Sequence, residues 1–192
     1  MDRRTLLQHA ACGLTCTTLP SAFAASARNK SVRPAPLPPG YRAVAERMGV
    51  PPLILYGVAL QESKMKFGEH ALPYPWTLCV RGEAKRYDSY REVVAALQHY
   101  VTNGVTNVDC GAMQVNWRWH KERLRSFRHA LDPYPNLFVG AQILVEQFKV
   151  TGNWFKAVGR YHNQVDLARA QRYATQVFGR IPTIPRRGGG HA

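Results

Sequence analysis

Acidic residues are scarce in this chain. Its 192 residues include 12 Asp and Glu against 26 Lys and Arg, which gives a formal net charge of +14 and an isoelectric point near 10.1. Such a charge suits nucleic acid, an anionic membrane surface, or a cell wall that carries carboxylates and phosphates. The charge alone does not choose among these partners, but no recognised nucleic-acid-binding motif accompanies it.

Long apolar runs and metal-binding motifs are also missing. After residue 27 no stretch approaches the roughly 20 apolar residues of a membrane-spanning helix, so we expect no transmembrane segment. The seven histidines and the cysteines show neither an HExxH motif nor CxxC pairs, so we expect no metal and no cofactor. Hydrophobic residues make up 45% of the chain, enough for one globular domain with a core.

The N-terminal sequence is typical of an export signal. It has a basic start, an apolar middle that is short for a bilayer span, and an Ala-Phe-Ala step at positions 22–24. We therefore predict a signal peptide over residues 1–24 and localisation in the periplasm. The paired arginines at positions 3 and 4 resemble a twin-arginine signal, although two arginines are also common in ordinary signals.

Few cysteines remain once the signal is removed. They are Cys79 and Cys110. Because an exported chain meets an oxidising compartment, we predict that these two form a disulfide, which would stabilise the fold by roughly 3 to 4 kcal/mol. The alternative is two free buried thiols.

The hydrophobic pattern predicts a mainly α fold, of the α+β class, with a small β-hairpin insertion. We expect a Pro-rich arm outside the core at 25–40, a domain at 41–180 and a flexible tail at 181–192. The period of apolar residues and the glycine stops predict helices near 41–48, 51–63, 89–103, 136–151, 154–163 and 166–178. Residues 76–87 predict a hairpin that turns at Gly82, and 108–116 an extended or tight-turn segment.

Glu62 is the first candidate for chemistry. In a helix that begins at the prolines 51 and 52, Leu55, Val58 and Ala59 lie on the same face as Glu62. A carboxyl held against apolar neighbours has a raised pKa, as a general acid near neutral pH requires. On the helix alone, the alternative is a glutamate turned outward into solvent.

Two later segments offer further polar groups. Gly111 lets the backbone approach a ligand and Gln114 can orient a carboxylate or an amide, while a methionine such as Met113 is more often core than contact. Positions 154, 158 and 161 share a helical face, so the Tyr161 ring should face the core. Its hydroxyl then needs a partner, either a buried carboxylate or a backbone carbonyl.

These segments carry a family resemblance. Glu62-Ser63, Gly111-Ala112-Met113-Gln114 and Tyr161 follow in order, and Asp132-Pro133, Asn136 and Gly140-Ala141 match a fourth motif. Over residues 41–178 the chain resembles a lytic transglycosylase of the soluble-lytic-transglycosylase, goose-lysozyme-like group. The stretch between the first two motifs resembles the subgroup found with conjugation and secretion machines. The family's tyrosine-asparagine pair is interrupted here, as Tyr161-His162-Asn163.

The resemblance implies a lysozyme-like domain that cleaves the MurNAc-GlcNAc β-1,4 bond of peptidoglycan and forms 1,6-anhydro-MurNAc. Glu62 would protonate the leaving oxygen and then take the proton of the muramyl 6-hydroxyl. Asp109 or Glu69 as a helping carboxylate stays open. The implied partners are peptidoglycan glycan strands and a conjugation, secretion or pilus apparatus, not nucleic acid.

The resemblance also implies the supporting residues. Ser63 would hydrogen-bond the substrate or the helix end, Met113 and Gln114 would line the glycan cleft, and Tyr161 would hold the Glu62 carboxyl. Asn163 would correspond to the asparagine of the family's tyrosine-asparagine pair and would support the site beside Tyr161.

Three alternatives remain. A hydrolytic muramidase could use the same fold, a non-catalytic wall-binding subunit could serve a secretion machine, and the charge alone would suit a nucleic-acid binder.

Overall fold

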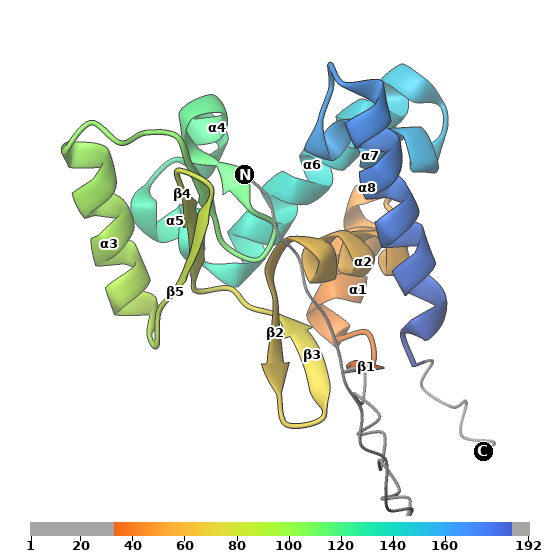
Figure 1. Ribbon diagram of the computed structural model, residues 1–192, viewed down its shortest axis with the longest axis horizontal. Coiled ribbons are helices and arrows are strands. Elements are labelled where there is room, and N and C mark those ends of the chain that lie inside the picture. Colours follow the sequence, from red (N-terminus) through yellow and green to blue (C-terminus); the bar gives the residue numbers. More distant parts are fainter. Residues whose placement is uncertain (1–32, 186–192) are drawn as a thin grey trace, which may run out of the picture. The chain divides into compact units, whose positions relative to one another are not determined.

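The computed structural model describes residues 33–185 (Figure 1). Helices dominate this part of the chain, which confirms the mainly α fold class. The predicted signal peptide and residues 186–192 lie outside the described residues. The helices are α1 (Pro39–Met48), α2 (Pro52–Ser63), α3 (Tyr90–Thr102), α4 (Trp117–Leu124), α5 (Phe127–Leu131), α6 (Pro133–Thr151), α7 (Trp154–His162), α8 (Leu167–Arg180) and the 3-10 helix η1 (Ile181–Thr183).

Two small sheets accompany the helices. One has the order β1-β3-β2 and the other β5-β4-β6-β7. Their strands are β1 (Arg33–Pro34), β2 (Lys64–Phe67), β3 (His70–Pro73), β4 (Thr77–Val80), β5 (Glu83–Arg86), β6 (Val108–Cys110) and β7 (Val115–Asn116). The β2–β3 hairpin projects away from the helices in Figure 1. The sequence pattern did not predict it.

The predicted hairpin at residues 76–87 is confirmed as β4 and β5. Val80 pairs with Glu83, so only Arg81 and Gly82 connect the strands. Both have positive φ, 54° and 84°, as a two-residue turn with the twist of the strands requires. The predicted segment 108–116 is likewise confirmed, as two short strands joined by a tight turn.

Most of the predicted helix ends are found. Ser89 caps α3 by accepting a hydrogen bond from the Glu92 amide at 3.2 Å, and Gly49 and Gly152 end α1 and α6 with φ of 71° and 62°. Gly179 was a wrong stop, because α8 continues through it to Arg180. A glycine inside a helix costs only about 1 kcal/mol, which the packing of α8 offsets.

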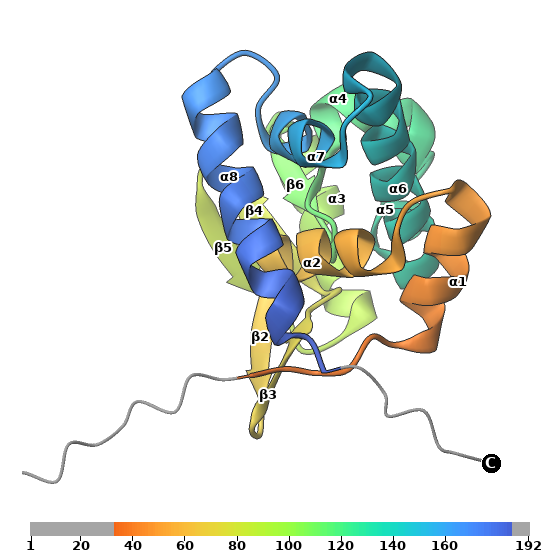
Figure 2. The same ribbon diagram turned by 90° about the vertical axis from the view of Figure 1, so that its right-hand side faces the viewer.

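Helix α2 lies at the centre of the fold. All its residues from Ile54 to Leu60 are buried, so protein covers the helix on every side. Figure 2 shows α8 crossing α2, and α6 packs against α1 and α7 elsewhere in the core. Glu62, near the C-terminal end of α2, therefore follows directly after a fully buried stretch of the helix.

The predicted arm and tail are partly wrong. Leu37 and Ile184 are buried with Tyr56 and Leu60 in a second apolar cluster, and the Tyr56 hydroxyl donates to the Ala35 carbonyl at 3.0 Å. Segments at both ends of the described chain thus belong to the core. The reason is that α2 is apolar on both faces and needs cover on the side away from the main core.

The predicted disulfide is also wrong in this structure. Cys79 and Cys110 are free. The pairing of β4 with β6 sets Leu78 opposite Cys110 and Cys79 opposite Asp109. Since successive side chains in a strand alternate between faces, Cys110 points into the core while Cys79 points to the other face. A bond between them would require a shift of the strand register.

No single helix between residues 33 and 185 is long and apolar enough to cross a membrane. Helices α1 and α2 reach the necessary length and composition only as a pair, bent by 119°. In the fold α2 is a core helix.

Asn136 ties the turn after β6 to α6. Its side-chain amide donates to the carbonyls of Cys110 and Ala130 at 2.8 and 2.9 Å and accepts from the Met113 amide at 2.9 Å. The side chain is fully buried. Gly111, with φ of 74°, lies so close that an added Cβ would be 2.6 Å from Asn136 Cγ.

Gly111→Ala should therefore destabilise the protein much more than Gly104→Ala. Both glycines have positive φ, 74° and 82°, but nothing lies within 4 Å of an added Cβ at Gly104. The backbone cost common to both is about 1 to 2 kcal/mol, and the overlap with Asn136 should add about 2 kcal/mol or more at Gly111. Urea unfolding of the two variants measures the difference. Equal losses would show that Asn136 moves aside without cost.

Candidate active site

A cleft of about 970 Å³ runs between the second sheet, α4, α7 and the loop that follows α7. It is at the large end of the range of ligand pockets. Its polar side chains come from several elements and include Glu62, Asp109, Gln114, Asn116, Arg160 and Gln164.

Glu62 lies at the C-terminal end of α2 and lines this cleft. The Tyr173 hydroxyl donates a hydrogen bond to Glu62 Oε1 at 2.5 Å. Burial disfavours the charged carboxylate and raises the pKa of Glu62 to about 7; the hydrogen bond from Tyr173 opposes the rise and the charge of Asp109 adds to it. The negative end of the α2 dipole also disfavours the anion. Much of Glu62 is therefore protonated at neutral pH, as a proton donor must be.

The residue that holds Glu62 differs from the one predicted. The Tyr161 hydroxyl donates to the Met113 carbonyl at 2.6 Å, so the expectation that it binds Glu62 is wrong. Of the two partners left open for that hydroxyl, the structure has the backbone carbonyl. Tyr173 takes the place beside Glu62 because α8 crosses α2 at this point.

Tyr173 could have been found in the sequence. Ala170, Tyr173, Ala174 and Val177 are all buried and follow the spacing i, i+3, i+4, i+7 of one helical face. A tyrosine inside such a stripe needs a partner for its hydroxyl. The sequence pattern does not say which of the two buried tyrosines reaches the acid.

Two of the predicted substrate-binding residues are structural. The Ser63 hydroxyl is buried and lies 2.7 Å from the Ala112 carbonyl and 3.1 Å from that of Ala59, so it binds the helix end and the turn rather than substrate. Met113 is fully buried against Gly140 and does not line the cleft, which corrects the prediction. Ser63 thus fastens the end of α2 to the turn at 111–114, and Met113 packs that turn against α6.

Gln114 does line the cleft, as predicted. Its backbone is in the left-handed region, with φ of 48°, which is uncommon for a residue with a side chain. Its side-chain amide donates to the Gly111 carbonyl at 2.8 Å, which orients the side chain in the wall of the cleft.

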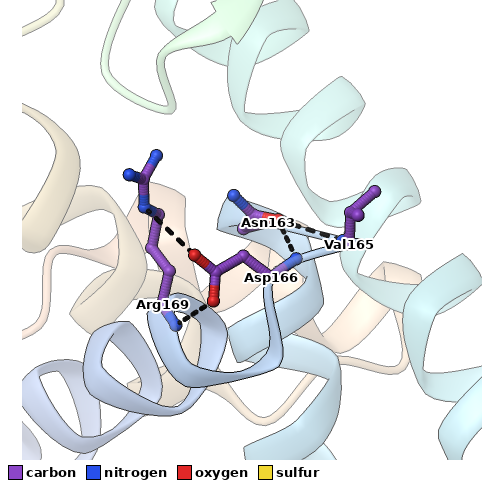
Figure 3. A network of polar contacts seen from close by, with 4 residues as sticks. All are labelled: Asn163, Val165, Asp166 and Arg169. Carbon is purple, nitrogen blue, oxygen red and sulfur yellow. Dashed lines mark hydrogen bonds and ion pairs between the residues drawn. The ribbon is translucent and has the colours of Figure 1, made fainter.

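Asn163 shapes the loop between α7 and α8 (Figure 3). Its Oδ1 accepts hydrogen bonds from the Val165 and Asp166 amides at 3.0 and 2.7 Å, and Asp166 in turn caps α8 by accepting from the Arg169 amide at 2.9 Å. Gln164 and Val165 of this loop line the cleft, whereas Asn163 is not among its lining residues. Asn163 therefore positions the loop.

The two helper carboxylates left open by the sequence lie in different places. Asp109 lines the cleft, where Asn116 donates to its Oδ1 at 2.7 Å and burial raises its pKa. Glu69 is exposed in the turn between β2 and β3 and does not line the cleft. The free thiol of Cys79 also lines it, and burial and the charge of Asp109 raise the pKa of that thiol.

Other cleft residues were not singled out by the sequence. The His162 ring stacks on the Tyr173 ring with centroids 4.4 Å apart and planes 1° apart. Trp119 lines the cleft although 70% of it is exposed, and the Arg118 guanidinium lies 5.0 Å from its ring centre. An exposed aromatic ring beside a cleft is suited to stack on a ligand. Within residues 33–185 no group of three His, Cys, Asp or Glu side chains could hold a metal ion.

Tyr173→Phe should raise the pKa of Glu62 further, because the hydrogen bond from Tyr173 stabilises the carboxylate. Tyr161→Phe is the matched control, since its hydroxyl bonds a backbone carbonyl instead. NMR titration of the Glu62 carboxyl carbon measures both. A larger shift with Tyr161→Phe would contradict the assignment of Tyr173.

Glu62→Gln should stabilise the protein above neutral pH. The folded-state pKa of Glu62 is raised from 4.5 to about 7, so its contribution is fully present below pH 4.5 and is lost as the pH rises through 7. A neutral glutamine avoids that loss, worth about 3 kcal/mol at full ionisation. Unfolding curves should show similar stabilities of the wild type and Glu62→Gln at pH 4. At pH 8.5 the variant should be more stable than the wild type. Parallel pH dependence of the two proteins would refute the raised pKa.

The chain was compared with protein-family models, curated proteins and solved structures, and none of the three comparisons found a match. The site is therefore described by its own geometry: a carboxyl with a raised pKa at a buried helix end, held by a tyrosine, in a cleft with a second carboxyl.

Proposed function

We propose that this protein is a lytic transglycosylase of peptidoglycan. It would cleave the β-1,4 bond between MurNAc and GlcNAc and release 1,6-anhydro-MurNAc ends. The observation that carries the proposal is Glu62, a carboxyl with a pKa of about 7 that Tyr173 holds at 2.5 Å in a cleft of about 970 Å³. The order of motifs in the sequence supports the same conclusion.

In this mechanism Glu62 acts twice. In its protonated form it donates its proton to the glycosidic oxygen as the bond to the leaving sugar breaks. The resulting carboxylate then takes the proton of the muramyl 6-hydroxyl, whose oxygen bonds to the anomeric carbon and closes the anhydro ring. A pKa near 7 suits both steps. At neutral pH the carboxyl can give up its proton in the first step, and the resulting carboxylate can accept a proton in the second.

The hydrogen bond from Tyr173 has a direct part in this cycle. It stabilises the carboxylate that forms after the first proton transfer and keeps Oε1 in one place. Since the burial of Tyr173 raises its own pKa well above 10, it stays a neutral donor throughout. The substrate's acetamido group could stabilise the cationic carbon, as in other substrate-assisted glycosidases.

The setting of the enzyme is part of the proposal. The signal-like N-terminus supports action in the periplasm, and a net charge of +14 would help the enzyme stay on an anionic wall. The long segment between Glu62 and Gly111 resembles that of the subgroup found with conjugation and secretion machines. This resemblance supports local remodelling of the wall for a conjugation, secretion or pilus machine.

A hydrolytic muramidase is the second candidate. It is favoured by Asp109, a second carboxyl in the same cleft whose charge acts on Glu62. Most glycosidases use two carboxyl groups, and Asp109 could activate a water molecule that replaces the 6-hydroxyl as the acceptor.

Product analysis on purified peptidoglycan tests the proposal. Mass spectrometry of the soluble fragments should show anhydro-muropeptides from the wild type. Glu62→Gln should lower the rate by about 10²- to 10⁴-fold, the usual contribution of a general acid. Asp109→Asn is the comparison variant and should still yield anhydro ends.

Two other results would replace the proposal. Reducing MurNAc ends that disappear in Asp109→Asn would indicate the hydrolytic muramidase. Binding to sacculi without soluble products, unaffected by Glu62→Gln, would indicate a non-catalytic wall-binding subunit.

A further inference from the structure

A second concave surface lies along α6 and shares no lining residue with the cleft that contains Glu62. It consists of two adjoining hollows of about 370 and 360 Å³, which share Arg123 and Gln142. The α6 residues that line them are those at positions 134, 135, 138, 139, 142, 145, 146 and 149, and from 135 onward they repeat with the spacing of one helical face. We call this surface the α6 groove.

Each hollow of the α6 groove contains apolar side chains. Phe138 and Val139 lie in one hollow, Met48 and Val145 in the other. Tyr134 lies at one end with 59% of its surface exposed. Apolar side chains of a ligand could therefore contact apolar side chains in each hollow.

Basic side chains also line the groove. Arg125 and His129 line one hollow and Lys149 lines the other, while the Arg47 guanidinium lies 5.2 Å from the Phe138 ring centre. Among the described residues that line the two hollows, the single acid is Glu146, and Arg123 neutralises it at 2.9 Å. The residues that line the groove thus carry a net positive charge.

The length of the groove limits its ligand. From Pro135 to Lys149 the helix advances about 21 Å at 1.5 Å per residue. An extended peptide covers the same distance with about six residues. Its side chains alternate, so three can contact the apolar residues of the groove while three contact its cations.

We propose that the α6 groove binds an extended acidic segment of a partner protein, about six residues long, whose alternate side chains are apolar. This goes beyond the proposed function, because the groove is separate from the cleft. The occupant is another protein, since residues 1–32 and 186–192 of this chain are themselves basic and a second copy carries the same charge of +14. A flat bilayer would not enter two concave hollows.

Fluorescence anisotropy tests the proposal with a fluorescein-labelled hexapeptide of alternating glutamate and leucine. The probes of the groove are Arg125→Glu and Lys149→Glu, exposed residues of the two hollows. Arg81→Glu is the matched control, because Arg81 is also an exposed arginine with positive φ, 54° against 61° for Arg125, and lies outside the groove.

Each groove variant should weaken binding of the hexapeptide by about tenfold or more, and Arg81→Glu by less than about twofold. A tripeptide of the same kind spans only one hollow, so its binding should be weakened by only one of the two groove variants. Unchanged circular dichroism melting curves verify that the variants are folded.

Several results would overturn the proposal. Absence of hexapeptide binding to the wild type would do so, and so would equal weakening by all three variants, which indicates general attraction to a basic protein. Vesicles of phosphatidylglycerol that bind more tightly than the peptide, and depend on Arg125 and Lys149, would indicate an anionic lipid surface instead.

Discussion

The hydrogen bond between Tyr173 and Glu62 depends on how two helices cross. It joins residues 111 positions apart in the sequence, and it exists because α8 packs over the C-terminal end of α2. Burial alone would make Glu62 a neutral acid with no means of stabilising its anion. The hydrogen bond from the tyrosine stabilises the carboxylate, so the proton affinity of Glu62 depends on this helix packing.

A buried brace keeps that carboxyl in position. Ser63 joins the end of α2 to the turn at 111–114, Asn136 joins the turn to α6, and Tyr161 joins it to α7. Each bond ends on a backbone group that would otherwise be buried without a partner. Ser63 and Met113, which the family resemblance places at the substrate, thus help to hold Glu62 in position instead.

Charge divides the described surface into two kinds of site. The cleft contains two carboxyls with raised pKa values. The α6 groove is lined by cations and by a single acid, Glu146, which is already paired with Arg123. The first arrangement suits proton transfer to an uncharged bond. The second suits attraction of an anionic chain, and the two sites share no lining residue.

The sequence by itself determined the local features of this protein: the helix that carries Glu62, the hairpin turning at Gly82, the glycine stops at 49 and 152, and Gln114 in an irregular segment. These depend on periodicity and turn chemistry within a few residues. Only the tertiary structure decided which tyrosine reaches Glu62, that Asp109 shares its cleft, and that Cys79 and Cys110 point to opposite faces. Such relations depend on strand register and helix crossing, which join distant parts of the chain and leave no mark in a local pattern.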